Sequence, residues 1–117
     1  MEFEYKRKKD KEARKIIANN LLNKYPDKIP VILEKDPTSR LTQINKTRFL
    51  VDKKSTVNQF ILEIKQTIKV GEEEAIFLSV SKKYSLSGSK LFEDLYKSHK
   101  DEDGFLYIMY TSELMFG

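Results

Sequence analysis

One amphipathic segment, residues 57–68, narrows the possible folds more than any other feature of this sequence. Apolar residues recur in it at intervals of three and four positions: Val57, Phe60, Ile61, Ile64 and Ile68. This spacing predicts a helix with one buried face, and Ser55 or Thr56 could cap its first turn. A helix of this kind needs an apolar surface to cover, so the segments on either side of it decide the fold.

Short apolar runs with the length of β-strands lie on both sides of this helix. Residues 29–35 and 47–51 precede it and are separated by a polar, turn-rich segment, which predicts a hairpin. Pro30 is best tolerated at the start of the first strand. The segments after the helix are a strand at 75–80, a loop at 81–90, a short helix at 91–99 and a strand at 105–110. This order predicts an α+β domain of the β-grasp type, with a four-stranded mixed sheet and one crossing helix.

Two helices are expected before the sheet. Residues 1–9 could form a short first helix, and Asp10 could cap a second one. The second helix would place apolar residues and one asparagine on a single face: Ala13, Ile16, Ile17, Asn20 and Leu21. Pro26 disfavours helical geometry at Tyr25, so this helix should end there.

The chain is long enough for one domain and too short for two. We therefore expect a single domain over residues 1–117, with a helical extension at 1–24, a β-grasp core at 25–110 and a flexible C-terminal tail at 111–117.

The residue types that most enzymes use are scarce here. The chain has no cysteine and one histidine, His99, and its four glycines are scattered rather than gathered in a phosphate-binding loop. The acidic run at 101–103 is better interpreted as a solvated loop than as a metal site or a pair of catalytic carboxylates. We expect no enzymatic activity, no catalytic residue, no metal and no cofactor.

Charge and hydropathy bear on partners and location. No apolar run is long enough to span a bilayer, and the charged N-terminus lacks the apolar stretch of a signal peptide, which indicates a cytoplasmic protein. Seven Lys/Arg and four Asp/Glu lie within residues 1–15, so binding to a nucleic acid or an anionic membrane is one interpretation. A solvated helix face is favoured, because acids are interleaved with the bases and no RNA-binding aromatic motif is present. No nucleic acid partner is expected.

Several segments resemble the signature segments of the autophagy-related ubiquitin-like modifiers, the GABARAP and microtubule-associated light-chain family. They are YPDKIPVILEK at 25–35, KTRFLV at 46–51, TVNQFI at 56–61 and HKDEDGFLYIMY at 99–110, and Phe3, Tyr5 and Arg14 fit the same pattern. The resemblance implies a β-grasp core with two extra N-terminal helices. It also implies covalent attachment, through a terminal glycine, to phosphatidylethanolamine on autophagosomal membranes, with the unmodified protein in the cytoplasm.

Gly117 is the residue to which the resemblance assigns lipid conjugation. Conjugation needs a carboxylate that can be adenylated and passed between thiolates, and a glycine has no Cβ to crowd the reacting carbon. Residues 111–117 could extend roughly 20–25 Å beyond the last strand. The implied partners are activating and conjugating enzymes and a processing or deconjugating cysteine protease. The alternative interpretation is a β-grasp adaptor that binds peptides and is never conjugated.

A second implied activity is peptide binding at the strand 47–51. Lys46 and Arg48 could protect an exposed sheet edge, or attract an extended peptide that pairs with it. The resemblance implies cargo receptors whose peptides carry an aromatic residue and, three positions on, an aliphatic one. The aromatic pocket would use Ile17, Leu21, Pro30, Ile32, Arg48, Leu50 and Phe105, and the aliphatic pocket would use Phe49, Val51, Phe60 and Ile64. Each apolar member could instead be an ordinary core residue.

The sequence departs from the family pattern at a few places. Glu63 stands where the family usually has an apolar residue beside the aliphatic pocket, so that pocket should be shallower or prefer other peptides. Ser79 replaces an aromatic residue that the resemblance links to the processing and conjugating enzymes. The loop at 81–90 lacks the usual asparagine and prolines.

Overall fold

Nine helices and strands make up the described part of the computed structural model, which covers residues 3–71, 73–81 and 84–112. In chain order they are α1 (Glu4–Lys8), α2 (Lys11–Lys24), β1 (Lys28–Lys35), β2 (Arg48–Asp52), α3 (Val57–Ile68), β3 (Phe77–Ser81), β4 (Tyr84–Ser85), α4 (Phe92–His99) and β5 (Leu106–Thr111). The strands form one sheet in the order β2-β1-β5-β3-β4.

The sheet is mixed, as expected for a β-grasp fold. β1 pairs antiparallel with β2 and parallel with β5, and β3 pairs antiparallel with both β5 and β4. The predicted β-grasp fold is confirmed, with one addition. The segment expected as a loop at 81–90 contributes the two-residue strand β4 at the far edge of the sheet.

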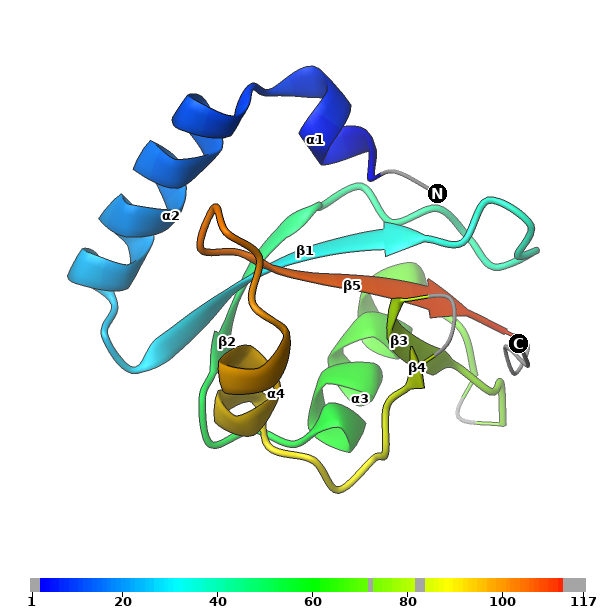
Figure 1. Cartoon of the computed structure of the whole chain (residues 1–117). Helices are drawn as coiled ribbons and strands as arrows, with labels where there is room; N and C mark the ends of the chain where they lie inside the picture. The colour runs from blue at the N-terminus through cyan, green and yellow to red at the C-terminus, as the bar shows by residue number, and fades with distance from the viewer. Residues whose placement is uncertain (1–2, 72, 82–83, 113–117) are drawn as a thin grey trace.

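Helices cover both faces of this sheet (Figure 1). α1 and α2 lie on one face, where Tyr5 and Ala18 pack against Ile32, Phe105 and Tyr107. α3 and α4 lie on the other face and bury the larger of the two apolar clusters. The molecule therefore has two cores, and β1 and β5 contribute side chains to both.

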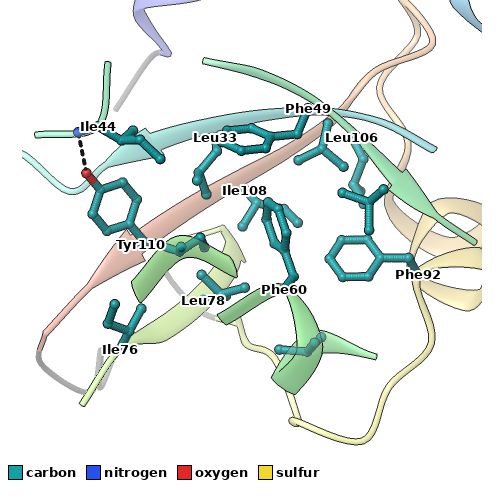
Figure 2. Packing of buried hydrophobic residues seen from close by; sticks show 14 of the residues in the cluster. Leu33, Ile44, Phe49, Phe60, Ile76, Leu78, Phe92, Leu106, Ile108 and Tyr110 are labelled. Carbon is teal, nitrogen blue, oxygen red and sulfur yellow. Dashed lines mark hydrogen bonds between the residues drawn. The ribbon is translucent and has the colours of Figure 1, made fainter. Parts of the chain in front are cut away.

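Helix α3 has the position and the buried face that its spacing predicts. Thr56 caps it through a capping box with Gln59, and Val57, Phe60, Ile64 and Ile68 are buried. The ring of Phe60 meets the rings of Phe49 and Phe92 edge to face, with centroids 5.3 Å and 5.4 Å away, respectively (Figure 2). This aromatic chain ties β2, α3 and α4 together.

Pro30 is the third residue of β1 rather than its first, and the ladder accommodates it. The amide of Leu33 donates to Thr47 on the β2 side, so the amides of alternate residues point to β2 and those between them point to β5. Pro30 falls in the second set, and pairing with β5 begins only at Val31. Its missing N–H therefore removes no hydrogen bond from the ladder.

The long connection between β1 and β2 is hydrogen-bonded to β5 through the side chain of Tyr110. The hydroxyl of Tyr110 donates to the carbonyl of Thr42 at 2.7 Å. It also accepts from the amide of Ile44 at 2.9 Å, the bond drawn in Figure 2. Ile44 and Leu41 are both buried in the larger core. A segment that looks like a polar loop in the sequence is therefore partly an interior element.

The buried face of α2 matches the predicted one only in part: Ile17 and Leu21 are partly buried and pack against the smaller of the two cores. Asp10 caps the helix as expected, accepting from the amide of Ala13 at 2.8 Å. Ile16, however, is 59% exposed, whereas Arg14 and Ala18 are buried. Apolar spacing of three and four positions did not identify the centre of this face, because its buried residues are the small Ala18, which packs closely against Gly104, and the charged Arg14.

The short helix α1 is held by a carboxylate from the sheet. Glu34 in β1 accepts hydrogen bonds from the amides of Glu4 and Tyr5, at 2.8 and 2.9 Å. These amides have no partner within the helix, so Glu34 satisfies donors at its positive end. The rings of Phe3 and Tyr107 also meet edge to face at 5.1 Å.

The acidic run at 101–103 was expected to be a solvated loop, and that expectation is wrong for Asp103. Its side chain is fully buried, and Nε of Arg14 lies 3.3 Å from Oδ2. Tyr107 donates its hydroxyl to the same oxygen at 2.5 Å, and the amide of Phe105 donates to Oδ1 at 2.8 Å. Burial and the nearby Asp103 carboxylate raise the pKa of Tyr107 well above its ordinary value.

The other two acids of the run, Asp101 and Glu102, form ion pairs with α1 and α2 nearer the surface. Lys6 in α1 donates to Asp101 at 2.5 Å, and Lys11 in α2 donates to Glu102 at 2.6 Å. The run is therefore a docking point for the N-terminal helices rather than a free loop.

Candidate peptide-binding site

Strand β2 forms one edge of the sheet, as the sequence predicts. Its side chains alternate, with Arg48, Leu50 and Asp52 exposed and Phe49 and Val51 buried in the larger core. One side of β2 is paired with β1. The backbone groups on its other side can pair with an added strand.

Two grooves flank this edge. The first groove, of about 310 Å³, lies between β2 and the end of α2 and is lined by Leu21, Lys46, Arg48, Phe49 and Leu50. The second groove, of about 270 Å³, lies between β2 and α3 and is lined by Lys28, Leu50, Val51, Asp52, Ser55, Gln59, Phe60 and Glu63. Leu50 borders both and is 37% exposed, so it forms the ridge between them.

The register of the hairpin sorts these residues by face. Leu50 lies opposite Pro30 and Arg48 lies opposite Ile32, so these four side chains point to the face that α1 and α2 cover. Phe49 and Val51 point to the face that α3 covers. A strand added to β2 would likewise direct alternate side chains to the two faces.

The residues expected around a bound aromatic side chain divide into two groups. Leu21, Arg48 and Leu50 line the first groove. The other four do not line it: Ile17, Ile32 and Phe105 belong to the same apolar cluster as Leu21, and Pro30 lies opposite Leu50 in the hairpin. Ile32 and Phe105 have no exposed surface. A peptide side chain can reach these two only if the residues above them move.

The residues expected around an aliphatic side chain also divide. Val51 and Phe60 line the second groove. Phe49 borders the first groove instead, and Ile64 is fully buried on the inner face of α3. All four belong to the larger core, so any pocket here uses core residues at their outer surface.

Two polar residues of the second groove, Lys28 and Gln59, were not expected from the sequence. The sequence could have indicated Gln59, because it precedes Glu63 by four positions and the two therefore share a face of α3. Lys28 could be found only from the hairpin register, which sets it opposite Asp52 with Nζ 3.7 Å from Oδ2.

The charges differ between the two grooves. Lys46 and Arg48 make the first groove basic, and Nζ of Lys46 lies 4.5 Å from the centroid of the Phe49 ring. The second groove holds one lysine and two carboxylates. Arg48 also acts on α1: burial raises the pKa of Tyr5, and the nearby guanidinium of Arg48 opposes that rise. The hydroxyl of Tyr5 is nonetheless buried without a hydrogen bond among the described residues.

Other expected features can be placed only in part. Gly117, the residue expected to be conjugated, lies outside the described residues. Within residues 3–71, 73–81 and 84–112, no three acidic or histidine side chains are arranged to hold a metal ion. None of the helices in this same part of the chain has the length and apolar character needed to cross a bilayer.

Comparison with known proteins identifies the family. The model of the family described as "Autophagy protein Atg8 ubiquitin like" matches residues 8–117. Autophagy-related protein 8e of Arabidopsis thaliana is 43% identical over 113 residues, covering 97% of this chain and 92% of that protein. Autophagy-related protein 8 of Mycosarcoma maydis is 40% identical over 117 residues, covering 100% of this chain and 98% of that protein.

A solved structure agrees with the sequence relatives. The crystal structure of Trypanosoma brucei ATG8 superposes with a TM-score of 0.92 at 32% identity, covering 100% of both chains. The mixed sheet, the crossing helix α3 and the two N-terminal helices are thus the architecture of that relative as well. On the family match and these relatives, the chain belongs to the Atg8 family of ubiquitin-like autophagy proteins.

Proposed function

We propose that this protein is a ubiquitin-like modifier conjugated through Gly117 to phosphatidylethanolamine on autophagosomal membranes, where its β2 edge recruits cargo receptors. Membership of the family, by a match that runs to residue 117, is the observation that carries the proposal. The two grooves beside the edge strand β2, which pairs with β1 on one side only, support the second half of it.

The grooves account for a peptide with an aromatic residue and an aliphatic residue three positions later. Successive side chains of a strand point to opposite faces, so two residues an odd number of positions apart point to different faces. The first groove borders the face of α2 and the second borders α3. A spacing of three positions also spans about 10 Å along the peptide, which lets it cross the ridge at Leu50.

The expected affinity is moderate. Burial of an aromatic side chain of about 200 Å² is worth roughly 5 kcal/mol before costs, and ordering of the peptide offsets much of that. The basic side chains of Lys46 and Arg48 would favour peptides with acids beside the aromatic residue. Such binding suits the reversible selection of cargo.

Conjugation would convert a protein without a described bilayer-spanning helix into a membrane-bound one. Phosphatidylethanolamine carries two acyl chains, and each buried CH₂ contributes about 0.8 kcal/mol, so one amide bond anchors the protein stably. The chemistry requires an activating and a conjugating enzyme that carry Gly117 as a thioester, and a cysteine protease that processes or reverses the product. The unconjugated form would be cytoplasmic.

Reconstitution with purified enzymes tests the conjugation. The protein is incubated with the family's activating and conjugating enzymes, ATP and phosphatidylethanolamine liposomes, and the adduct is detected by mass spectrometry. We expect a lipid adduct on Gly117 with the wild type and a strongly reduced yield with Gly117→Ala. No adduct, with peptide binding retained and abolished by Leu50→Ala, would instead identify an unconjugated peptide-binding adaptor.

A further inference from the structure

We propose that the second groove of this chain prefers a basic side chain, lysine or arginine, to the aliphatic one that the family resemblance implies at that position of the peptide, and that Glu63 is the residue that specifies it. The inference rests on the proposed peptide-binding function and names the chemistry of one position in the peptide. It follows from the composition of the second groove and from the partners of its charged groups.

The second groove has an apolar floor and a polar wall. Val51 and Phe60 are core residues that reach the groove, and Leu50 forms its boundary with the first groove. The remaining lining residues are polar or charged, with Glu63 on the exposed side of α3. A purely aliphatic ligand side chain would cover the floor and would leave the polar wall facing it without a partner.

The two carboxylates of this groove differ in what they already bind. Asp52 accepts from the amide of Lys54 at 2.8 Å through Oδ1, and Nζ of Lys28 lies 3.7 Å from Oδ2. The carboxylate of Glu63 makes no hydrogen bond or ion pair with any residue that the structure describes. Since the single lysine of the groove is engaged with Asp52, one negative charge remains uncompensated.

A lysine or arginine side chain complements both parts of the groove. Its methylene stem can lie along Leu50, Val51 and Phe60, and its charged end can reach Glu63 while remaining partly in water. An ion pair at such a partly exposed place is worth only a small factor in affinity. Its effect is therefore selection among peptides that the first groove already holds, rather than binding by itself.

The same charges orient the peptide along β2. The strand begins beside Lys46 and Arg48 and ends at Asp52, next to Glu63 across the groove. A peptide with acids beside its aromatic residue and a base three positions later matches this gradient in one direction only. Reversal would bring like charges together at both ends.

Three peptides with a fluorescent label test the inference by anisotropy titration. They share an acidic flank and an aromatic residue and differ only at the third position after it, which is arginine, leucine or glutamine. The variants are Glu63→Gln, Glu63→Leu and, as a matched charge control, Glu12→Gln on the exposed part of α2, which lines neither groove.

The wild type should bind the arginine peptide about two- to fivefold more tightly than the leucine peptide at low salt. Glu63→Gln should remove this preference, Glu63→Leu should reverse it, and Glu12→Gln should keep it. The preference should also fall toward unity at high salt, where exposed pairs are screened.

Tighter binding of the leucine peptide by the wild type, unchanged in Glu63→Gln, would overturn this inference and leave the peptide site intact. Failure of all three peptides to bind would overturn the proposed peptide site itself, and this inference with it.

Discussion

The carboxylate of Asp103 and the guanidinium of Arg14 face each other inside the molecule, with Oδ2 3.3 Å from Nε and with side chains 0% and 11% exposed. Arg14 belongs to α2 and Asp103 to the turn before β5. The pair therefore joins the N-terminal helices to the β-grasp core through two buried charges.

Arg14→Met should lower the free energy of unfolding by about 3 kcal/mol, because a buried carboxylate that loses its counter-charge is strongly destabilising. The hydrogen bonds from Tyr107 and Phe105 to Asp103 remain and limit the loss. Urea unfolding measures it, with Lys11→Met as the control because its pair with Glu102 is exposed. Equal losses in the two variants would contradict a structural role for the buried pair.

The half-buried pair of Lys6 and Asp101 should make stability depend on pH. Burial alone would raise the pKa of Asp101, but the hydrogen bonds from Lys6 and from the amide of Asp103 outweigh it and hold this pKa below the ordinary value of 3.8. A carboxyl group whose pKa is lower in the folded state stabilises the fold above its unfolded pKa and loses that contribution as the pH falls.

Asp101→Asn should therefore cost about 0.5–1 kcal/mol of unfolding free energy at pH 7, a small value because the pair is partly solvated. The difference from the wild type should shrink below about pH 4. Urea unfolding at pH 7, 5, 4 and 3 measures both. A difference that stays constant down to pH 3 would show that the charge of Asp101 is not the cause.

Removal of a hydroxyl should have opposite consequences at two buried tyrosines. The hydroxyl of Tyr5 has no hydrogen bond within the described part of the chain, so Tyr5→Phe should leave stability unchanged or raise it. Tyr110 bonds both Thr42 and Ile44, so Tyr110→Phe should cost about 1–3 kcal/mol. Chemical unfolding of both variants compares them, and a larger loss for Tyr5→Phe would refute this assignment.

Gly104 should not tolerate a side chain. Its φ of +96° lies in the region that favours glycine, and an added Cβ would come within 3.0 Å of the Cβ of Ala18 in α2. Gly104→Ala should lower the free energy of unfolding by more than about 1 kcal/mol. Gly88→Ala is the control, since the three atoms nearest to an added Cβ there belong to the side-chain amide of Asn58, which can move. Comparable thermal stability of the two variants would be contrary to this expectation.

A charge reversal in the first groove should weaken peptide binding without unfolding the protein. Arg48 is exposed on β2 and borders the first groove, so Arg48→Glu should reduce the affinity for acid-flanked aromatic peptides by about tenfold at low salt. Arg40→Glu makes the same change of net charge at an exposed position that lines neither groove. If the two variants bind equally, the effect is one of net charge and the first groove is not the site.

Local sequence patterns were sufficient for most of the framework. The spacing in α3, the strands on either side and the cap of α2 at Asp10 were all predicted, and the cap of α3 at Thr56 was one of two candidates. Each depends on contacts between neighbours in sequence or on a simple alternation of burial. Two buried residues of α2 were missed, because Ala18 is small and Arg14 is charged, so neither contributes to an apolar stripe.

The sequence by itself determined a β-grasp domain with an edge strand, because alternation and helical periodicity are properties of consecutive residues. Only the tertiary structure decided that Asp103 is buried, that Glu34 caps α1 and that Lys28 compensates Asp52 rather than Glu63. These pairings join residues that are distant in the chain. Whether a charge is paired or open to a ligand depends on which distant groups the fold brings beside it.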